Sequence, residues 1–399
     1  MLVFAAPGQG AQAPGFLTPW LEFPQFADRL AAWSDLAGCD LIAAGTTAGA
    51  DEIRDTAVAQ PLLVAAAIAA AEVLCGDLDK ARREGCIAAG HSVGELAAGA
   101  IAGVLSPDDA MRLIAVRSKA MARAAAAEDT GMTAVLGGDE AEVLAAIDAR
   151  GLTPANINAP GQIVAAGTKA QLDALAADPP PGTRLRPLSV AGAFHSPHMA
   201  PAVDALREAA AGVTVTDPAI PLLSNLDGAE VSSGTDWLQR IITQVSAPVQ
   251  WQACMRTMVD LGASAFVELL PGGTLTGLAR RALPGVATAA LKTPDDLTAA
   301  RSLLAEHGAP DPFEYGHLPE WRLLVSPFDG TFRAGHPSQI AAPGVAVTSG
   351  ADLGHVEVRT GQHSISPSFP CTIIEWLVED GDPVNTGQPL VRLQPEGTE

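Results

Sequence analysis

The stretch Cys86-Ile87-Ala88-Ala89-Gly90-His91-Ser92-Val93-Gly94-Glu95 joins a short apolar strand to an alanine-rich helix. Residues 90–94 match the pattern G-x-S-x-G, which between a strand and a helix places a serine hydroxyl at the end of a buried strand. The helix N-terminus directs free N–H groups at charge that develops beside Ser92. This setting favours Ser92 as a nucleophile over the alternative, a tight turn whose serine caps the helix.

Short apolar strands alternate with helices on both sides of this stretch, through residues 1–290. Strands are expected at 2–6, 86–89 and 266–270, and helices near 107–126, 197–210, 235–245 and 249–262. This alternation predicts an α/β fold with a parallel-sheet core. The longest apolar run, residues 61–71, is far shorter than the roughly 20 residues of a membrane span. We expect it to form a buried helix.

A different pattern lies between residues 128 and 189. Strands are expected at 133–136, 155–158, 162–166 and 184–188, and helices at 139–149 and 169–176. The order β-α-β-β-α-β is that of a ferredoxin-like unit. Because the larger pattern resumes at residue 190, we predict a ferredoxin-like subdomain, 128–189, inserted into an α/β core of residues 1–127 and 190–292.

The C-terminal part of the chain is rich in expected strands and contains a repeat. Val325-Ser326-Pro327 recurs as Ile365-Ser366-Pro367, and Val347-x-x-Gly350-x-x-Leu353 recurs as Val384-x-x-Gly387-x-x-Leu390. Two similar halves predict a small quasi-symmetric β-sandwich at 321–399. Residues 293–320, with one helix and then a Pro- and Gly-bearing stretch, are predicted to be a linker.

The composition excludes several classes of function. The chain of 399 residues carries 24 Lys and Arg against 45 Asp and Glu, a formal charge of −21, so its field repels nucleic acid and anionic membranes. The five cysteines are an odd number without a C-x-x-C pair, which favours a reducing compartment without a disulfide framework or structural zinc. The N-terminus lacks the basic start of a signal peptide. We expect a soluble, cytoplasmic protein that needs no metal or other cofactor.

A serine nucleophile needs a general base, and three of the eight histidines are candidates. His195 follows an expected strand and precedes a helix, which places it at the carboxyl edge of the sheet, where sites collect. His198 competes with it on spacing alone. His91 stands beside Ser92, where the turn is expected to direct its side chain away. The five others, at 307, 317, 336, 355 and 363, lie in or beyond the predicted linker.

Two further features suit a site built around Ser92. A Gly-rich turn at residues 7–12 follows the first strand, and its glutamine side chains could donate to an oxyanion from the neighbouring strand; an ordinary loop fits equally well. Arg117 lies on the helix that follows the Ser92 helix. An arginine that faces a pocket binds a carboxylate or a phosphate through two hydrogen bonds, whereas the alternative is a solvated helix charge.

Together these motifs resemble the malonyl-CoA:acyl carrier protein transacylases, acyltransferases of fatty acid and polyketide synthesis. The resemblance covers residues 1–290. It rests on the glutamine turn, the Gly90–Glu95 motif, Arg117, His195 and three segments at 156–162, 248–251 and 268–275. The family also has a hydrolase-like core with an inserted ferredoxin-like subdomain. The resemblance therefore implies transfer of malonyl from malonyl-CoA to the phosphopantetheine thiol of an acyl carrier protein.

The resemblance also implies a role for each matching residue. Ser92 would be the acylated nucleophile and His195 its base, oriented by the backbone carbonyl of Gln244 in place of the usual acid. The remaining roles would be an oxyanion site at the Val93 N–H and Gln9, a carboxylate clamp at Arg117, and pocket walls at Asn158 and Phe194. Phe194 stands where a Phe excludes an α-methyl branch and a Ser admits one. The sequence reads Gly-Ala-Phe-His where the malonyl-type motif has His-Ala-Phe-His.

The C-terminal segment resembles a biotinyl/lipoyl carrier domain of the barrel-sandwich type. Such domains present a modified lysine on a hairpin between their halves, and Thr360 stands at that position in Glu357-Val358-Arg359-Thr360-Gly361. A threonine cannot form the amide bond to biotin or lipoate, and no lysine follows Lys292. We therefore interpret the segment as a degenerate carrier fold.

Two other functions compete with malonyl transfer. A hydrolase could use the same Ser92 and His195, but a carboxylate clamp at Arg117 has no use in removing neutral acyl groups. A non-catalytic scaffold or a carboxylase carrier subunit would fit the C-terminal segment, but the missing lysine removes the carrier role and the intact pair speaks against a scaffold. For the acidic carrier protein, Arg280 and Arg281 are a candidate basic patch.

Overall fold

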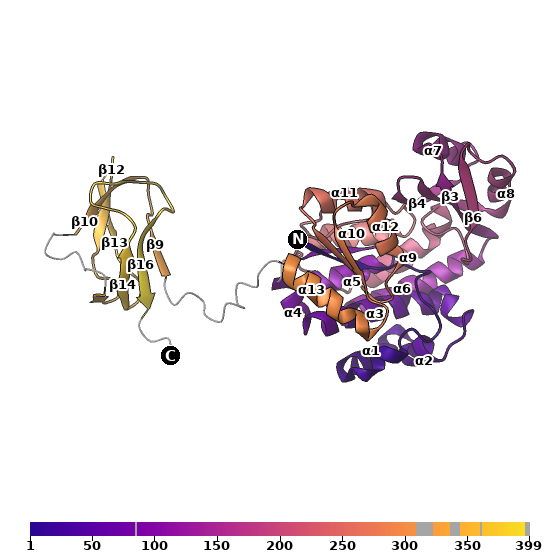
Figure 1. The fold of residues 1–399 in the computed structure, drawn as a ribbon, viewed down its shortest axis with the longest axis horizontal. Coiled ribbons are helices and arrows are strands. Elements are labelled where there is room, and N and C mark those ends of the chain that lie inside the picture. The colour runs from indigo at the N-terminus through magenta and orange to yellow at the C-terminus, as the bar shows by residue number, and fades with distance from the viewer. Residues whose placement is uncertain (84–85, 309–321, 336–343, 360, 396–399) are drawn as a thin grey trace. The chain divides into compact units, whose positions relative to one another are not determined.

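A computed structural model describes residues 1–83, 86–308, 322–335, 344–359 and 361–395. The chain forms two compact units, Met1–Asp311 and Pro312–Glu399 (Figure 1). The first unit contains the parallel sheet and the inserted subdomain, and the second contains strands.

The core of the first unit is a four-stranded parallel sheet in the order β2-β1-β7-β8. Its strands are β1 (Leu2–Ala6), β2 (Ile87–Gly90), β7 (Ala265–Glu268) and β8 (Ala287–Ala290). Every residue of β1, β2 and β7 is buried, as in sheets that are covered by helices on both faces. The α/β class with a parallel-sheet core is confirmed. β8, which the sequence analysis did not identify, completes the sheet.

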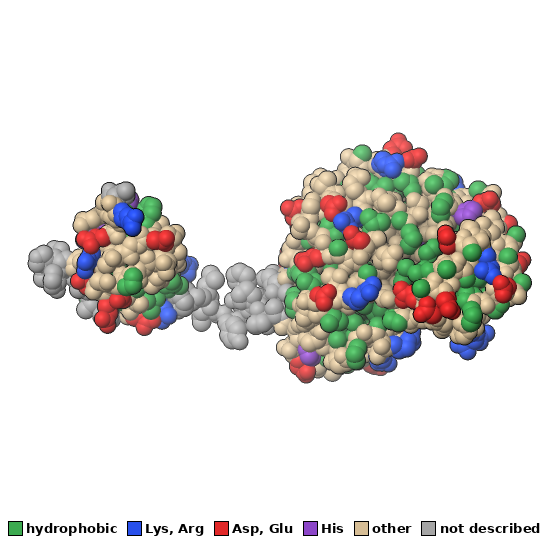
Figure 2. Space-filling view, turned by 90° about the horizontal axis from the view of Figure 1, so that it is seen from above, with side chains coloured by type: hydrophobic (Ala, Val, Ile, Leu, Met, Phe, Trp, Pro, Cys, Tyr) green, Lys and Arg blue, Asp and Glu red, His purple; other side chains and the backbone are tan. Residues whose placement is uncertain are grey.

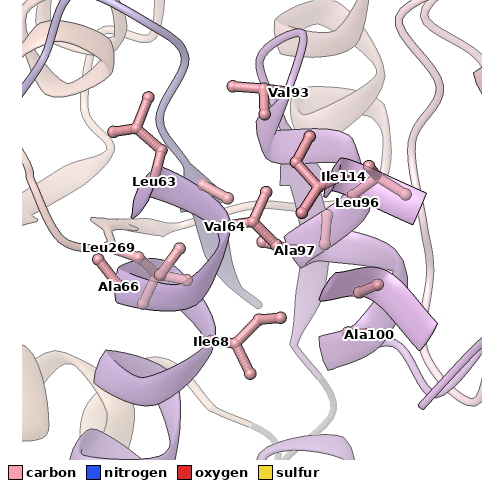
Figure 3. Close-up of a cluster of buried hydrophobic side chains, with 14 of the residues drawn as sticks. Leu63, Val64, Ala66, Ile68, Val93, Leu96, Ala97, Ala100, Ile114 and Leu269 are labelled. Atoms are coloured by element: carbon pink, nitrogen blue, oxygen red, sulfur yellow. The ribbon is translucent and has the colours of Figure 1, made fainter. Parts of the chain in front are cut away.

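Alternate residues of β1 face two separate hydrophobic clusters. Leu2 and Phe4 pack into the larger cluster, with α1 (Pro24–Ala37), α3 (Thr56–Cys75), α5 (Gly94–Ile101) and α6 (Pro107–Ala126). Val3 and Ala5 pack into the other, with α11 (Trp251–Asp260) and α12 (Thr274–Ala282). This two-residue alternation is that of a strand with two buried faces. Figure 3 shows apolar side chains of α3 and α5 meeting in the larger cluster.

Helix α3 contains the apolar run that is expected to be buried. By length and composition this helix is able to cross a membrane, but 89% of its most apolar window lies inside the first unit. It packs against α1, α5 and α6. Because neighbours surround it on all sides, alanine and leucine occupy every face of the helix. The buried-helix prediction is confirmed.

The inserted subdomain is a four-stranded antiparallel sheet in the order β4-β5-β3-β6. Its elements in chain order are β3 (Thr130–Gly137), α7 (Glu140–Asp148), β4 (Thr153–Ala159), β5 (Gln162–Thr168), α8 (Lys169–Ala177) and β6 (Thr183–Pro187). Val135, Ile147 and Leu175 belong to its own hydrophobic cluster. The β-α-β-β-α-β order that the sequence predicts is present.

The other elements of the first unit are short helices or cover the sheet. They are η1 (Thr18–Glu22), α2 (Leu41–Thr46), η2 (Glu52–Arg54), α4 (Leu78–Arg83), η3 (Pro197–Met199), α9 (Ala200–Ala210), α10 (Gly234–Gln244), η4 (Pro294–Asp296) and α13 (Leu297–His307).

Leu297 and Leu304 of α13 are buried in the larger cluster, and Arg301 Nη2 donates to the Val73 carbonyl at 2.9 Å. Residues 293–308 are therefore part of the first unit and not a linker. A helix in this stretch was predicted from the sequence, but its packing into the core was not.

The surface of the first unit mixes charges on the face that Figure 2 shows. Asp and Glu side chains are spread among Lys, Arg and hydrophobic side chains there. This face offers no continuous basic surface of the kind that binds a phosphate backbone.

The second unit contains two four-stranded antiparallel sheets, in the orders β13-β12-β10-β15 and β11-β14-β16-β9. The strands are β9 (Arg322–Val325), β10 (Gly330–Ala334), β11 (Ala346–Val347), β12 (Gly354–Val358), β13 (Gly361–Ile365), β14 (Cys371–Trp376), β15 (Pro383–Val384) and β16 (Pro389–Pro395). The first half of the repeat supplies β9 to β12 and the second half supplies β13 to β16. If each strand is replaced by its counterpart in the other half (β9 by β13, β10 by β14, and so on), the strand order of one sheet becomes that of the other, read in reverse. The internal repeat thus corresponds to two halves that exchange strands between both sheets.

The repeated glycines join the two halves of the second unit. The Gly350 N–H donates to the Pro367 carbonyl at 2.7 Å, and the Gly387 N–H donates to the Ser326 carbonyl at 2.8 Å. Both glycines have positive φ, 79° and 81°, a conformation that favours glycine. Thr360, the residue at the expected lysine position, lies outside the described residues.

Candidate active site

Ser92 occupies a sharp turn between β2 and α5. Its φ is +54°, in the left-handed region that non-glycine residues seldom adopt. A Cβ atom on Gly90 would lie 2.0 Å from the Gly94 carbonyl carbon, and one on Gly94 would lie 2.2 Å from the Ala6 oxygen. Both glycines of G-x-S-x-G are therefore required by close backbone contacts with the helix and with β1.

His195 contacts Ser92 directly. Its Nε2 atom lies 2.6 Å from Ser92 Oγ, and its Nδ1 atom lies 3.0 Å from the Gln244 carbonyl oxygen. Nδ1 also lies 3.1 Å from the side-chain Nε2 of Gln244. In the tautomer that carries the proton on Nδ1, this nitrogen donates to the carbonyl, which only accepts, and Nε2 is left to accept from the serine hydroxyl. His195 also has a positive φ, +56°. The structure brings together the serine, the histidine and the carbonyl that the sequence analysis assigned to each other.

The two competing histidines have other partners. His198 Nδ1 pairs with Glu128 Oε2 at 2.6 Å, with a quarter of its side chain exposed. His91 Nε2 lies 2.8 Å from Asn158 Oδ1, and its ring packs edge-on against Trp251. Among the three candidates, His195 alone reaches Ser92 in the described part of the chain.

Burial sets the protonation state of His195. Desolvation, followed by the positive charge of Arg117, lowers the pKa of His195 to about 3, although the hydrogen bond to Gln244 raises it. The imidazole is therefore neutral throughout the ordinary pH range, and one ring nitrogen keeps its lone pair.

We expect the rate constant for acylation of Ser92 to stay constant between pH 7.5 and pH 5.5. A histidine with the ordinary pKa of about 6.5 would lose about tenfold in its neutral form over this range. His195 stays neutral because its pKa lies near 3. Rapid-quench kinetics with labelled acyl-CoA measure this rate constant directly. A tenfold fall that fits one pKa near 6.5 would contradict the expectation.

Arg117 extends from α6 to the nucleophile. Its Nη1 donates to Gln60 Oε1 at 2.6 Å and its Nη2 to Ser92 Oγ at 3.4 Å. The side chain is buried, and this desolvation lowers the pKa of Arg117 to about 10, so it remains charged. Among the described residues no carboxylate lies within 4.0 Å of the guanidinium. The charge of Glu95 acts on Arg117, but a buried cation without a directly paired carboxylate is arranged to receive an anionic ligand.

Two backbone N–H groups are available for an oxyanion. Within the described residues, the N–H groups of Val93 and Gln9 have no protein acceptor, and both residues line the cavity at Ser92. The side chains of the glutamine turn are directed elsewhere, because Gln9 Nε2 donates to the Arg54 carbonyl and Gln12 Nε2 to the Ile53 carbonyl. Donation by the glutamine side chains, which the sequence analysis considered, does not fit this geometry.

A small cavity of about 90 Å³ opens at the serine and histidine. Phe194 forms part of its wall, as expected. Asn156 lines the cavity, whereas Asn158, the predicted wall residue, binds His91 from the same strand. The irregular pairing of β4 between Pro154 and Asn156 and between Ile157 and Ala159 is not readable from the sequence. The cavity is lined by Gln9, Gln60, His91, Ser92, Val93, Met121, Met132, Asn156, Leu188, Val190, Phe194 and His195.

Two buried residues at the site were missed by sequence reasoning. Gln60 lies on α3 and holds one guanidinium nitrogen of Arg117. Asn225 accepts a hydrogen bond from the Ser92 N–H at 2.7 Å. Gln60 is a polar residue at the start of the long apolar stretch of α3, and that contrast is the signal that points to it. Asn225 follows a short apolar run, Ile220–Leu223, and had no distinctive local pattern.

Comparison with known proteins places these residues in a family context. A family model described as the acyl transferase domain matches residues 3–295. The malonyl CoA-acyl carrier protein transacylase of Mycolicibacterium smegmatis is 54% identical over 285 residues, which cover 70% of this chain and 98% of the relative. The corresponding protein of Escherichia coli is 34% identical over 307 residues, which cover 75% and 98%.

Solved structures show the same fold. The crystal structure of MCAT from Mycobacterium tuberculosis is 50% identical, with a TM-score of 0.72 over 75% of this chain and 99% of that chain. A structure of a type II PKS acyl-carrier protein in complex with its malonyl-transacylase matches with 29% identity and a TM-score of 0.69 over 75% and 99%. The family model ends at residue 295, before the second unit begins.

Proposed function

The chain belongs to the acyl transferase family, and from that membership we infer that it transfers malonyl from malonyl-CoA to an acyl carrier protein. Its relatives at 54% and 34% identity carry the name malonyl CoA-acyl carrier protein transacylase. We place the reaction in the cytoplasm. Fatty acid or polyketide synthesis is the process that uses the malonyl group on the carrier.

The observation that carries the choice of substrate is the environment of Arg117. Its guanidinium lies 3.4 Å from Ser92 Oγ, is buried, and forms no ion pair within 4.0 Å among the described residues, although the charge of Glu95 acts on it from farther away. When malonyl is esterified to Ser92, its free carboxylate is two carbons from the acyl carbon and within reach of this cation. Arg117 thus favours malonyl over acyl groups that carry no charge.

In the first half of the proposed reaction, Ser92 becomes acylated. His195 Nε2 takes the hydroxyl proton as Ser92 Oγ attacks the thioester carbonyl. The N–H groups of Val93 and Gln9 donate to the oxyanion that forms. The thiol of CoA leaves with the proton from His195, and the Gln244 carbonyl holds the imidazole in the tautomer that this exchange needs.

In the second half, the phosphopantetheine thiol of the carrier protein replaces CoA. His195 takes the thiol proton, the sulfur attacks the seryl ester, and Ser92 recovers its proton when the ester bond breaks. Because donor and acceptor use one cavity in turn, the reaction is of the ping-pong type. A single cavity of about 90 Å³ is sized for the acyl group and not for two thioesters together.

Labelled malonyl-CoA tests this proposal in two steps. The protein alone is expected to take up about one malonyl group per chain. Addition of phosphopantetheinylated carrier protein then moves the label to the carrier. Label that appears as free malonate in place of carrier-bound malonyl, at a rate matching turnover, would favour the hydrolase alternative.

We also propose that Phe194 excludes α-branched extender units. Its ring forms part of the cavity wall next to His195 and is buried. An α-methyl group on the bound acyl chain would have to share this space.

Replacing Phe194 with serine is expected to raise the use of methylmalonyl-CoA relative to malonyl-CoA. The change in the ratio of kcat/KM values is expected to be roughly tenfold to two-hundredfold, the range for one extra carbon in a pocket. Steady-state assays with each donor measure the ratio, with wild type as the reference. A wild-type enzyme that already prefers methylmalonyl-CoA would overturn this role.

We propose that the second unit is a biotinyl/lipoyl-like barrel sandwich that carries no biotin or lipoate. The two sheets exchange strands between the halves of the repeat, as expected for such a fold. β12 and β13 are paired as far as Val358 and Gly361, and the sequence offers no lysine after Lys292. Acyl transfer itself uses residues from Gln9 to Gln244, all in the first unit.

Two results are expected for the second unit. The intact protein keeps its unmodified mass after co-expression with biotin and lipoate ligases, because no amine is available on the hairpin. A chain that ends near Pro310, outside the described residues, folds and transfers malonyl at near wild-type kcat, because α13 remains to cover the core. Mass spectrometry and transfer assays check both. A truncated chain that is folded by circular dichroism but inactive would show that the second unit contributes to transfer.

A further inference from the structure

Ser92 is held in a conformation that its own backbone disfavours. A serine at φ +54° lies in a sparsely populated region, and such a residue persists where surrounding groups fix it. The contact between Ser92 Oγ and His195 Nε2, at 2.6 Å, depends on this conformation. Some group must therefore hold the backbone of Ser92 in place.

Asn225 makes the contacts that this task requires. Its Oδ1 accepts from the Ser92 N–H at 2.7 Å, and its Nδ2 donates to the Gly90 carbonyl at 2.8 Å. One planar amide thus bridges the residue before the turn and the nucleophile itself. Asn225 is fully buried, so water does not compete for either bond.

The position of Asn225 is fixed without any help from Ser92. The preceding segment runs beside β2, where the Leu223 N–H donates to the Ala88 carbonyl at 3.0 Å and Leu222 forms a parallel bridge with Ala88. The carbonyl of Asn225 accepts from the Gln250 N–H at 2.8 Å. Backbone hydrogen bonds that do not involve Ser92 therefore anchor Asn225 beside β2, and it can impose a geometry on the turn.

Glu95 completes this arrangement from the first turn of α5. Its Oε1 accepts from the Asn225 N–H at 2.7 Å, while its Oε2 is buried and has no partner among the described residues. Burial raises the pKa of Glu95 to about 8, although the Asn225 N–H and the charge of Arg117 lower it. Whether the Glu95 carboxyl group is protonated or ionised, its Oε1 accepts the same hydrogen bond from the Asn225 N–H. The side chain ties α5 to Asn225 and does not touch the reacting atoms.

We propose that Asn225 is a positioning residue that holds Ser92 in its left-handed conformation, and that Glu95 fixes Asn225 through its backbone N–H. This inference rests on the proposed role of Ser92 as nucleophile. It predicts that an amide is needed at 225, because one atom must accept from Ser92 and another must donate to Gly90. An aspartate supplies the first bond but places an oxygen against the Gly90 carbonyl.

Replacing Asn225 with alanine tests the proposal. The rate constant for acylation is expected to fall roughly 5- to 150-fold, the range for release of a strained residue, while KM for malonyl-CoA changes little. Asn225→Asp is expected to fall within the same range. Ser224→Ala is the matched control, because Ser224 is the buried neighbour but its hydroxyl accepts from the Leu226 N–H and makes no hydrogen bond to the turn among the described residues.

A second measurement separates this proposal from the proposed function. A fluorophosphonate probe reacts with Ser92 irrespective of the natural acyl donor, and its rate of labelling is expected to fall in Asn225→Ala by a factor similar to that for acylation. If the wild-type protein fails to transfer malonyl but the probe still distinguishes the variant, the function is wrong and the positioning role stands. Equal probe reactivity in wild type and Asn225→Ala overturns the positioning role.

Glu95 gives an independent test if Asn225→Ala does not fold. Glu95→Gln preserves the acceptor for the Asn225 N–H and is expected to retain acylation within about threefold of wild type. Glu95→Leu removes the acceptor and is expected to behave like Asn225→Asp, with a loss in the acylation rate and not in KM. Wild-type rates in the folded Glu95→Leu protein would overturn the part assigned to Glu95.

Discussion

Replacing Ser92 with alanine is expected to abolish covalent labelling by malonyl-CoA and to lower malonyl transfer by several orders of magnitude. The alanine lacks the oxygen that forms the ester, and loss of either member of such a pair removes most of the rate enhancement. His195→Ala is expected to cause a loss of similar size, because His195 Nε2 lies 2.6 Å from Ser92 Oγ and no other base reaches it among the described residues. Intact-mass analysis and a transfer assay measure both effects.

His198→Ala is the matched control for His195→Ala. His198 is three residues away, yet it pairs with Glu128 at the surface, so its variant is expected to keep wild-type activity. Wild-type stoichiometry of labelling in Ser92→Ala would show that another residue carries the acyl group. A larger loss in His198→Ala than in His195→Ala would exchange the roles of the two histidines.

The second large effect is expected at Arg117. Replacing it with alanine leaves the malonyl carboxylate unpaired in a buried pocket, a penalty of roughly 2–5 kcal/mol. This corresponds to a fall in kcat/KM for malonyl-CoA of about 30-fold to several thousandfold. Acetyl-CoA has no carboxylate, and its kcat/KM is expected to fall much less or to rise.

The ratio of the two kcat/KM values separates a clamp from a structural role. Damage to the fold lowers both values together, whereas loss of a carboxylate partner lowers the malonyl value selectively. Arg112→Ala is a suitable control, because Arg112 lies on the same helix, is about half exposed and pairs with Asp109. An unchanged malonyl-to-acetyl ratio in Arg117→Ala would remove Arg117 from the substrate site.

The parts of the site that the sequence made predictable are those with short-range patterns. The strand, the turn and the helix around Ser92 occupy adjacent residues, and two glycines mark the close backbone contacts there. Likewise, α6 spans the predicted residues 107–126, because Ser106 caps it by accepting from the Asp109 N–H. In both cases a pattern in adjacent residues is enough to predict the order of the elements, although the φ of Ser92 also depends on the distant Asn225. The pairing of Ser92 with His195 and Gln244, in contrast, was implied by the family resemblance.

The parts that could not be predicted depend on contacts between distant segments. Asn225 accepts a hydrogen bond from Ser92, although the two residues are 133 positions apart in the sequence. No local sequence pattern predicts that contact. Asn156 and Asn158 share one strand whose pairing is irregular, and of the two only Asn156 lines the described cavity. Helix α13 was recognised as a helix, but its place in the core depends on contacts with β8 and α3.

Ser92 and His195 are the two non-glycine residues with positive φ in the described part of the chain. Selection for folding alone would favour glycine at both positions, since glycine adopts this conformation without steric cost. Glycine can neither accept an acyl group nor take a proton. The two positions on which the chemistry depends thus have an unfavourable backbone conformation. This is a local compromise between stability and activity. Improved thermal stability is therefore best sought elsewhere, because gains at these two positions would come at the expense of turnover.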